Sequence, residues 1–289
     1  MRNHPSRPIS VNFHLWKPCN ARCKFCFATF RDIDGHLSAT DAVRVVRLLA
    51  EAGCEKLNFA GGEPTLCPHL GLLLSQARHC GMTTGIVTNG FGLPRILDEH
   101  ATDIDWVGLS IDSGVARTQS LLGRGDDKYV SRSVELSDLT RARGVGVKLN
   151  TVVTRLNWEE DMTALVRRVR PERWKVFQVL PIDGQNDGMV EPLLISTEQF
   201  RAFVDRHAHL VAEGFAPVAE DNEAMVGSYA MVDPLGRFYD GSTGRYVYSA
   251  PILEVGVDTA LAQVTFSPVK LVARGGLYDW TRTNSGEVR

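Results

Sequence analysis

The chain has 289 residues, of which 44% are hydrophobic, and its 32 lysines and arginines nearly balance its 34 aspartates and glutamates, for a net charge of -2. This balance argues against a general nucleic-acid-binding protein, and no apolar run approaches the length that crosses a bilayer. The opening residues, Met1-Arg-Asn-His-Pro-Ser-Arg-Pro8, contain no apolar signal-peptide core, so we expect a cytoplasmic protein with no membrane partner.

Short apolar strands alternate with helical stretches along most of the chain, a pattern typical of βα units around a parallel sheet. We predict strands near residues 9–16, 56–60, 84–88, 105–111, 146–153 and 173–180, and helices near 39–52, 68–80, 93–100, 128–143, 158–169 and 197–213. Six units are too few for a closed eight-stranded barrel. The sequence therefore predicts an α/β fold, an open partial (β/α)6 barrel of TIM type over residues 1–215. Residues 216–289 are expected to be a C-terminal extension that closes the barrel without being an independent domain.

Three cysteines follow the first predicted strand in the string Cys19-Asn-Ala-Arg-Cys23-Lys-Phe-Cys26. A CxxxCxxC spacing can hold three irons of a four-iron, four-sulfur cluster and leave the fourth iron open for chemistry. Zinc bound by the same cysteines is the alternative, with His14 as a fourth ligand. The aromatic Phe25 before the last cysteine favours the cluster, as in the radical S-adenosylmethionine (SAM) enzymes that this motif resembles. The other cysteines, Cys54, Cys67 and Cys80, are scattered and are expected to be buried in a reducing compartment.

A second motif, Gly61-Gly62-Glu63-Pro64, ends the second predicted strand. Glycines allow a close approach of the backbone to a ligand, and a carboxylate can accept hydrogen bonds from an ammonium group. Taken alone, such a string is a plain turn. Its position one βα unit after the cysteines favours a site that holds the amino acid end of SAM.

Alternation of side chains along the strands predicts which residues point into the barrel. In the fifth strand Lys148, Asn150 and Val152 share one face, and the opposite face carries Val147, Leu149, Thr151 and Val153. The same reasoning points Lys56, Asn58 and Lys175 inward. Buried ammonium groups need anions, so three inward lysines favour a polyphosphate ligand. The alternative is that each lysine reaches water from a strand end.

Together with further strings of the sequence, these motifs resemble those of viperin and its prokaryotic relatives from Ile9 to about Trp280. The resemblance is carried by the following strings: Ser-Val-Asn-Phe-His14, Leu57-Asn-Phe-Ala-Gly-Gly-Glu-Pro64, Gly123-Arg-Gly125, Lys148-Leu-Asn-Thr-Val-Val153, Glu159-Glu-Asp-Met162, Arg173-Trp-Lys-Val-Phe-Gln178, Ile252-Leu-Glu-Val-Gly-Val257 and Arg274-Gly-Gly276. Viperin-like enzymes convert a nucleoside triphosphate, typically CTP, into its 3′-deoxy-3′,4′-didehydro analogue, which terminates viral RNA chains.

The resemblance implies roles for individual residues, which are expectations here. The cluster ligands would be Cys19, Cys23 and Cys26, and SAM would be contacted by Gly62, Glu63, Ser110 and Arg124. The triphosphate would be bound by Lys56, Lys148, Lys175 and Arg274, with Asn150 near the nucleotide. Tyr229 would lie near the ribose and donate a proton, although a tyrosine packed in the extension is an equal alternative.

The resemblance also implies a mechanism and partners. A [4Fe-4S] cluster would cleave SAM to a radical that takes hydrogen from C4′ of the ribose, after which the 3′-hydroxyl leaves as water and one electron is taken up. A flavodoxin or ferredoxin would supply electrons, and we expect a monomer. Residues 266–280, which include Arg274, are expected to form a lid ordered by substrate. The nucleobase, CTP or else UTP or GTP, is left open.

Two departures from the family concern the ends of the chain. Animal viperins begin with an amphipathic membrane helix and end in a tryptophan that docks the cluster-assembly machinery. This sequence has a short polar start and ends in Gly286-Glu-Val-Arg289, which favours a free cytoplasmic enzyme.

Two other functions stay open at this stage. One is a radical SAM enzyme that modifies a peptide or a small metabolite, although no cysteine follows Cys80 to hold an auxiliary cluster. The other is a non-catalytic iron-sulfur or zinc module, which would need neither the Gly-Gly-Glu-Pro string nor the inward lysines.

Overall fold

The computed structural model describes residues 7–280, which are built around one ten-stranded sheet with the order β10-β9-β8-β1-β2-β3-β4-β5-β6-β7. The strands are β1 (Ser10–Trp16), β2 (Lys56–Gly61), β3 (Thr83–Thr88), β4 (Trp106–Ser110), β5 (Gly146–Val153), β6 (Arg173–Gln178), β7 (Pro217–Glu220), β8 (Ala230–Val232), β9 (Arg237–Asp240) and β10 (Val247–Pro251). In this order, all neighbouring strands from β8 through β1 to the last strand, β7, pair in parallel. The pairs β8–β9 and β9–β10 are antiparallel. Within residues 7–280 the edge strands β10 and β7 do not pair with each other, so the barrel is open, which confirms the predicted fold class.

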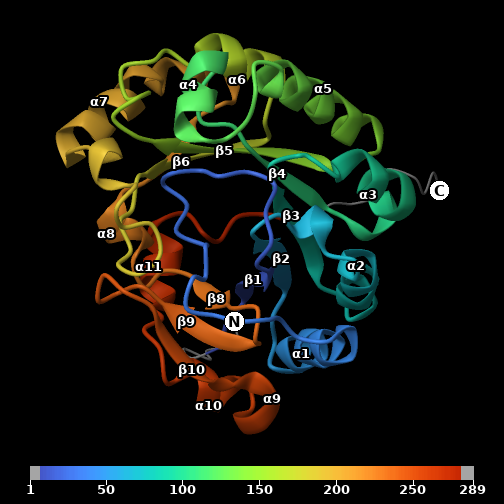
Figure 1. The fold of residues 1–289 in the computed structure, drawn as a ribbon. Helices are drawn as coiled ribbons and strands as arrows, with labels where there is room; N and C mark the ends of the chain where they lie inside the picture. The colour runs from blue at the N-terminus through green and yellow to red at the C-terminus, as the bar shows by residue number, and fades with distance from the viewer. Residues whose placement is uncertain (1–6, 281–289) are drawn as a thin grey trace.

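The helices surround the curved sheet, most of them on its outer, convex side, and the short helices that follow β7 and precede Arg274 lie at its open side (Figure 1). The helices are α1 (Ala39–Glu51), α2 (Leu70–His79), α3 (Leu93–His100), α4 (Ala116–Leu122), α5 (Tyr129–Ala142), α6 (Thr163–Val169), α7 (Thr197–Arg206), α8 (Asn222–Met225), α9 (Ile252–Val255), α10 (Val257–Leu261) and α11 (Pro268–Ala273), with 3-10 turns at Pro64–Leu66, Ala101–Asp103, Glu191–Leu193 and Ala208–Glu213. The outward side chains of the strands, such as Leu57, Val147 and Trp174, are fully buried in the main hydrophobic core. This apolar layer explains why the opposite face of each strand is free to carry polar groups.

The inward side chains form a polar lining that changes from the start to the end of the strands. Toward the strand starts, β1, β2, β4, β5 and β6 carry the inward residues Ser10, Lys56, Trp106, Lys148 and Arg173. The next inward residues of the same strands are Asn12, Asn58, Gly108, Asn150 and Lys175, followed by His14, Ala60, Ser110, Val152 and Phe177, and β3 contributes Val87. The predicted inward direction of Lys56, Asn58, Lys148, Asn150 and Lys175 is therefore confirmed. Alternation of side chains in extended backbone is the physical reason.

The strands of the C-terminal extension join the same sheet at both edges. β7 pairs with β6, and β8 pairs with β1, so the extension supplies the neighbours of the first and sixth barrel strands. Sequence reasoning placed no strand here because these segments are short. The division between residues 215 and 216 stays a prediction.

Two predicted helices differ from the structure in their bounds, and a further helix was not predicted. The predicted helix at 158–169 begins only at Thr163 in α6. Residues 154–160 form a turn instead, in which the amides of Trp158 and Glu160 donate to the carbonyls of Thr154 and Asn157. The Asn157 side chain fixes this turn, because it donates to the carbonyls of Asp112 and Val152. The predicted helix at 197–213 is α7 followed by a 3-10 turn, and α4 had no predicted counterpart.

Two expectations from the ends of the chain concern residues outside the described range, namely the polar start before Arg7 and the terminus at Gly286 to Arg289. Among residues 7–280, none of the helices has both the length and the apolar character required to cross a bilayer.

The glycines that end β2 bring two chain segments close together. A side chain at Gly61 would collide with the Trp16 backbone, and a Cβ at Gly62 would lie 2.2 Å from the Lys17 carbonyl oxygen. The Gly62 amide donates to Trp16 O. These glycines therefore let the segment that leads to the cysteines pass directly over the end of β2, and both also line the cavity described below.

We predict that Gly62→Ala destabilises the protein by about 1 to 3 kcal/mol, the usual cost of forcing atoms into a closely packed place. The measurement is the free energy of unfolding in denaturant, or the shift in Tm. Gly114→Ala is the matched control, because a Cβ there meets its nearest neighbour at an ordinary 3.4 Å. Equal stability of the two variants would contradict the packing argument.

Candidate active site inside the curved sheet

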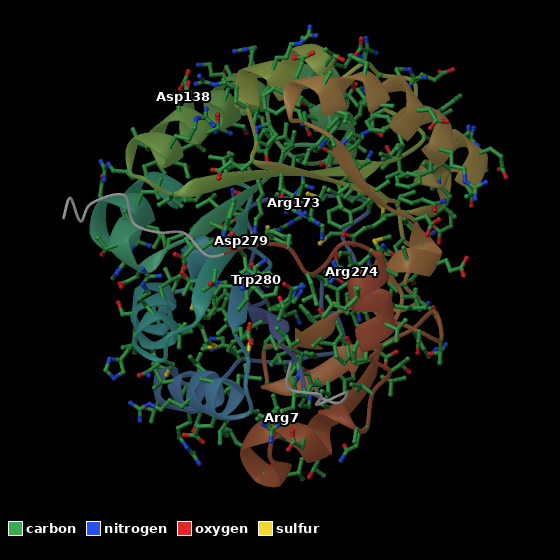
Figure 2. All side chains as sticks on the ribbon, turned by 180° about the vertical axis from the view of Figure 1, so that it is seen from behind. Arg7, Asp138, Arg173, Arg274, Asp279 and Trp280 are labelled. Atoms are coloured by element: carbon green, nitrogen blue, oxygen red, sulfur yellow. The ribbon has the colours of Figure 1, made fainter. Side chains whose placement is uncertain are left out.

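One cavity of about 320 Å³ fills the concave side of the sheet. The connection between β1 and α1, which carries the cysteines, crosses its front at the strand ends (Figure 1). The segment after α11 crosses its rear at the strand starts, where Figure 2 shows Arg173, Asp279 and Trp280. Both segments contribute lining residues, so the cavity lies between cysteines in front and basic side chains behind.

Backbone hydrogen bonds hold the cysteine segment in place at the front. The amides of Arg22 and Lys24 donate to the carbonyls of Gly123 and Leu122, and the amide of Cys26 donates to Cys23 O. Gly123 has a φ of +77°, and a Cβ there would lie 2.1 Å from Arg22 O. A glycine is therefore required where the cysteine segment meets the end of α4.

The three thiols of this segment fit a cluster better than a single metal ion. Cys19, Cys23 and Cys26 all line the cavity, and burial raises the pKa of each thiol, that of Cys23 to about 12. Thiolates therefore form here only with a strong positive partner such as cluster iron. Within residues 7–280 no three His, Cys, Asp or Glu side chains meet as closely as one metal ion requires. In a four-iron cluster each cysteine binds a different iron, so wider spacing is suitable.

His14 lines the same cavity behind the cysteine segment. It is only 5% exposed, its ring packs edge-on against Phe30 and Tyr239, and burial lowers its pKa to about 4. Its Nδ1 has no protein partner in the described structure. The histidine is therefore neutral, and it belongs to an aromatic wall of the cavity.

Glu63 of the Gly-Gly-Glu-Pro string is 1% exposed and bonded to protein donors. Its Oε1 accepts from the Thr65 amide and from the hydroxyls of Thr65 and Thr88, and its Oε2 accepts from the Asn89 amide. Gly62 lines the cavity, whereas Glu63 is not among the lining residues. The carboxylate thus fixes the turn after β3, and it has one remaining lone pair on Oε2 for a ligand.

Arg124 and Ser110 lie at the front of the cavity, near the cysteines. Arg124 Nε is 2.7 Å from the buried Asp112 carboxylate, and its guanidinium lies 5.2 Å from the centre of the Phe25 ring. Asp112 also accepts from the Val152 amide. Burial opposes the charge of Arg124, but Asp112 outweighs this effect and raises the pKa of the guanidinium well above its usual value. Arg124 is therefore a permanent, positioned cation next to the cysteines.

Asparagines occupy the middle of the cavity. Asn58 Nδ2 donates to Asn12 Oδ1 at 3.0 Å, and Asn150 lies on the neighbouring side of the barrel. A Cβ at Gly108 would approach Asn150 Nδ2 to 3.0 Å. Amide groups can both donate to and accept from hydroxyl groups, so this middle layer suits a sugar.

The rear of the cavity is strongly basic. The ammonium groups of Lys56 and Lys148 both donate to the Tyr278 hydroxyl, and Lys148 Nζ lies 4.2 Å from the centre of the Trp106 ring. Arg173 donates to Gly275 O. Burial, together with the neighbouring cations, lowers the pKa of Lys56 to about 7 and that of Lys148 well below its usual value. An anionic ligand would restore the full charge of these groups.

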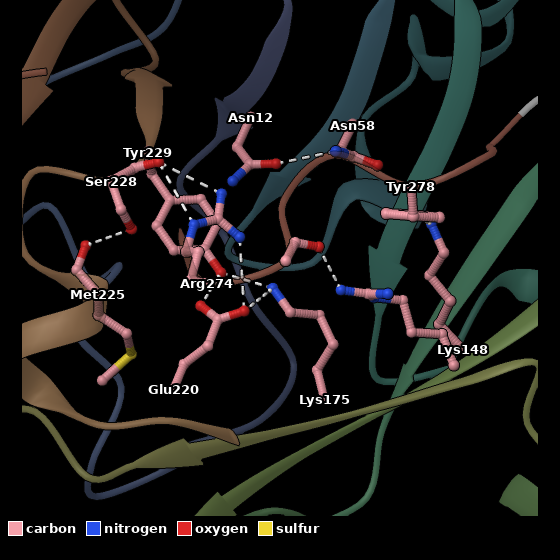
Figure 3. Close-up of polar contacts among 12 residues, drawn as sticks. Asn12, Asn58, Lys148, Lys175, Glu220, Met225, Ser228, Tyr229, Arg274 and Tyr278 are labelled. Carbon is pink, nitrogen blue, oxygen red and sulfur yellow. Dashed lines mark hydrogen bonds and ion pairs between the residues drawn. The ribbon is translucent and has the colours of Figure 1, made fainter. Parts of the chain in front are cut away.

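Lys175, Glu220, Tyr229 and Arg274 form one network at the side of the cavity (Figure 3). Glu220 Oε1 is 2.7 Å from Lys175 Nζ and 3.4 Å from an Arg274 nitrogen. Tyr229 donates to Glu220 Oε2, accepts from Lys175 Nζ at 2.5 Å, and lies under the Arg274 guanidinium at 3.6 Å from the ring centre. The structure thus brings Tyr229 together with two of the expected phosphate ligands.

Sequence reasoning missed four residues of this site, which are Asn12, Arg173, Glu220 and Tyr278. Strand alternation could have found Asn12 and Arg173, because they share the inward face with His14 and Lys175. Glu220 and Tyr278 reach the site through the extension, and no local pattern marks them.

Comparison with known proteins agrees with this arrangement. The family model of the Radical SAM superfamily matches residues 16–169. The S-adenosylmethionine-dependent nucleotide dehydratase of Flammeovirga pacifica is 43% identical over 94% of this chain and 96% of its own length. The protein of the same name from Lacinutrix mariniflava is 43% identical over 99% of this chain, which spans 62% of that longer relative.

Solved structures support the fold alone. SuiB of Streptococcus suis bound to S-adenosylmethionine matches with a TM-score of 0.66 at 17% identity, over 81% of this chain and 60% of that one. Coproporphyrinogen III oxidase of Escherichia coli, a radical SAM enzyme, matches with a TM-score of 0.58 at 15% identity, over 94% of this chain and 75% of that one. By sequence and by fold, the chain belongs to the radical SAM superfamily and, within it, to the viperin family of S-adenosylmethionine-dependent nucleotide dehydratases.

Proposed function

We propose that this chain is a radical SAM enzyme that dehydrates a nucleoside triphosphate to its 3′-deoxy-3′,4′-didehydro analogue. CTP is the first candidate for the substrate, and UTP and GTP are the alternatives. The observation that carries the proposal is the order of groups along one cavity. Cysteines lie in front, asparagines in the middle, and Lys56, Lys148 and Arg173 at the rear. A nucleotide is anionic at one end and hydroxylated at the centre, so its triphosphate matches the rear and its ribose matches the middle.

Residues of this chain would hold the cofactors and the substrate. Cys19, Cys23 and Cys26 would bind a [4Fe-4S] cluster, and Gly62, Glu63, Ser110 and Arg124 would hold SAM beside it. When bound, these cofactors supply the radical that removes the C4′ hydrogen of the ribose. Asn12, Asn58 and Asn150 would orient the ribose, and the cations at the rear and side of the cavity would bind the triphosphate.

Tyr229 is the proposed donor of the proton that leaves with the 3′-hydroxyl as water. Its hydroxyl lies between Lys175 and Glu220, and burial and the Glu220 charge raise its pKa well above the usual value, so it is protonated at neutral pH. We further propose a monomer in the cytoplasm that takes its electrons from a flavodoxin or a ferredoxin.

The test is an anaerobic assay with reconstituted protein, SAM, dithionite and CTP, UTP, GTP or ATP in separate reactions. We expect one nucleotide to stimulate formation of 5′-deoxyadenosine and to yield a product that is lighter by one water, both measured by mass spectrometry. Cys23→Ala is the negative control. The proposal fails if no nucleotide gives the dehydrated product, and a peptide or metabolite substrate would then be sought.

We predict that only the three cysteines of the CxxxCxxC motif bind the cluster. Alanine at Cys19, Cys23 or Cys26 should abolish the brown chromophore and the bound iron of anaerobically reconstituted protein. Alanine at Cys54, Cys67 or Cys80 is the matched control and should leave the iron content unchanged, because these thiols do not line the cavity. A full cluster in Cys23→Ala would contradict the assignment.

Triphosphate binding should take up protons, because burial lowers the pKa of Lys56 to about 7 in the free protein and a phosphate partner raises it again. Below the free pKa the lysine is already charged, so affinity is constant there. Above it affinity should fall, by about tenfold per pH unit for one such group, until the pKa of the complex is reached.

The measurement is the Kd of the nucleotide between pH 7.5 and 9.5 by calorimetry, in two buffers with different heats of ionisation. Lys56→Met should bind more weakly and take up fewer protons. A wild-type Kd that is independent of pH, without proton uptake, would contradict the prediction.

We propose that residues 266–280 form a lid that the nucleotide stabilises. The segment carries Arg274 and Tyr278, whose side chains reach Glu220, Lys56 and Lys148 across the cavity. Nucleotide with SAM should therefore slow tryptic cleavage after Arg274, relative to cleavage after the exposed Arg44 on α1. Cleavage rates that are the same with and without nucleotide would identify the segment as fixed scaffold.

A further inference from the structure

Glu220 is a buried carboxylate just outside the cavity. It ends β7 with a side chain that is 0% exposed, and it is not among the residues that line the cavity. Lys175, Tyr229 and Arg274 do line it, and all three contact Glu220. Glu220 therefore acts on any ligand through these three side chains and not by contact.

The network is fully connected, because each oxygen of Glu220 has its own partners. Oε1 faces the two cations, Lys175 at 2.7 Å and Arg274 at 3.4 Å, and Oε2 accepts from the Tyr229 hydroxyl. Lys175 Nζ also lies 2.5 Å from Tyr229 Oη. The four residues come from β6, β7, the segment before β8 and the end of α11, so this contact unites the barrel with the extension.

The charges of the network favour a defined direction for its protons. Burial alone would raise the pKa of Glu220, but Lys175 and Arg274 lower it below its usual value, so the carboxylate is ionised. Lys175 can only donate, and Glu220 can only accept. Tyr229 is the one member that can do both, and a rotation about its C–O bond turns the same proton from Glu220 toward the cavity.

We propose that Glu220 is a positioning residue that holds Lys175 and Tyr229 as a proton relay for departure of the 3′-hydroxyl, an inference that rests on the proposed function. Tyr229 gives its proton to the 3′ oxygen as the C3′–O bond breaks and water leaves. The phenolate then takes a proton from the Lys175 ammonium, and the resulting amine regains one from solvent after product release. The electron that completes the alkene comes from the reductant named above.

Glu220→Gln tests this role, because it keeps the size of the side chain and removes its charge. We expect the nucleotide Kd to stay the same or to decrease, since an anion next to the phosphate-binding cations is lost. Formation of the dehydrated product should fall at least about tenfold, the usual contribution of general acid catalysis being larger than this. 5′-Deoxyadenosine should still form, so its ratio to product should rise.

Tyr229→Phe and the double variant complete a double-mutant cycle. If Glu220 acts through Tyr229, the double variant should be no slower than Tyr229→Phe alone. A structural role predicts instead additive losses, with Kd and turnover damaged together, and that result would overturn the proposal. If Glu220→Gln fails to fold, Glu220→Asp is the second variant. Its ratio of 5′-deoxyadenosine to dehydrated product should stay closer to that of the wild type than the ratio of Tyr229→Phe does.

A measurement on protein without cofactors gives an independent readout. The difference in phenolate absorbance between Glu220→Gln and the same variant with Tyr229→Phe reports the ionisation of Tyr229. Removal of the neighbouring carboxylate should shift this ionisation to lower pH than in wild type, and an unchanged titration would overturn the positioning role. The wild-type assay separates the two claims. If the wild type forms no dehydrated product, the proposed function is wrong. If Glu220→Gln has the same ratio of 5′-deoxyadenosine to product as the wild type, only the relay is wrong.

Discussion

Burial of cations inside a curved sheet is the constraint on which this structure depends. Lys56, Lys148, Arg173, Lys175 and Arg274 all line one cavity, where loss of hydration makes each charge costly. The free protein reduces this cost with a shared phenol at Tyr278 and a carboxylate at Glu220. Both partners come from the C-terminal extension, so the extension is needed for the barrel to tolerate its own basic interior.

Two crossing segments give the cavity its direction. The cysteine segment passes over the strand ends, where Gly61, Gly62 and Gly123 allow backbone to meet backbone. The segment after α11 passes behind the strand starts (Figure 2). Closure of these segments over a bound substrate, as proposed for residues 266–280, would shield a reactive intermediate from water.

Carboxylates that lie behind the cavity wall hold the groups that face it. Glu63 fixes the turn at Thr88 and Asn89 in front, and Glu220 fixes Lys175 and Tyr229 at the side. Neither lines the cavity. The buried carboxylates thus hold the polar side chains that a ligand contacts, so these side chains lose little conformational entropy when the ligand binds.

The strand pattern, the cysteine motif as a candidate cluster site and the inward direction of Lys56, Lys148 and Lys175 could all be predicted from the sequence, because they follow from local spacing and from the two-residue period of a strand. The start of α6 was predicted too early, since the turn that precedes it depends on a distant carbonyl of Asp112. Other contacts depend on the folded chain: the Tyr278 hydroxyl accepts from Lys56 and Lys148, and Glu220 pairs with Lys175. In the same way Glu63 bonds to its own protein, and β7 and β8 extend the sheet. These contacts join residues far apart in the chain, and no local rule predicts which of many polar side chains a buried charge will meet.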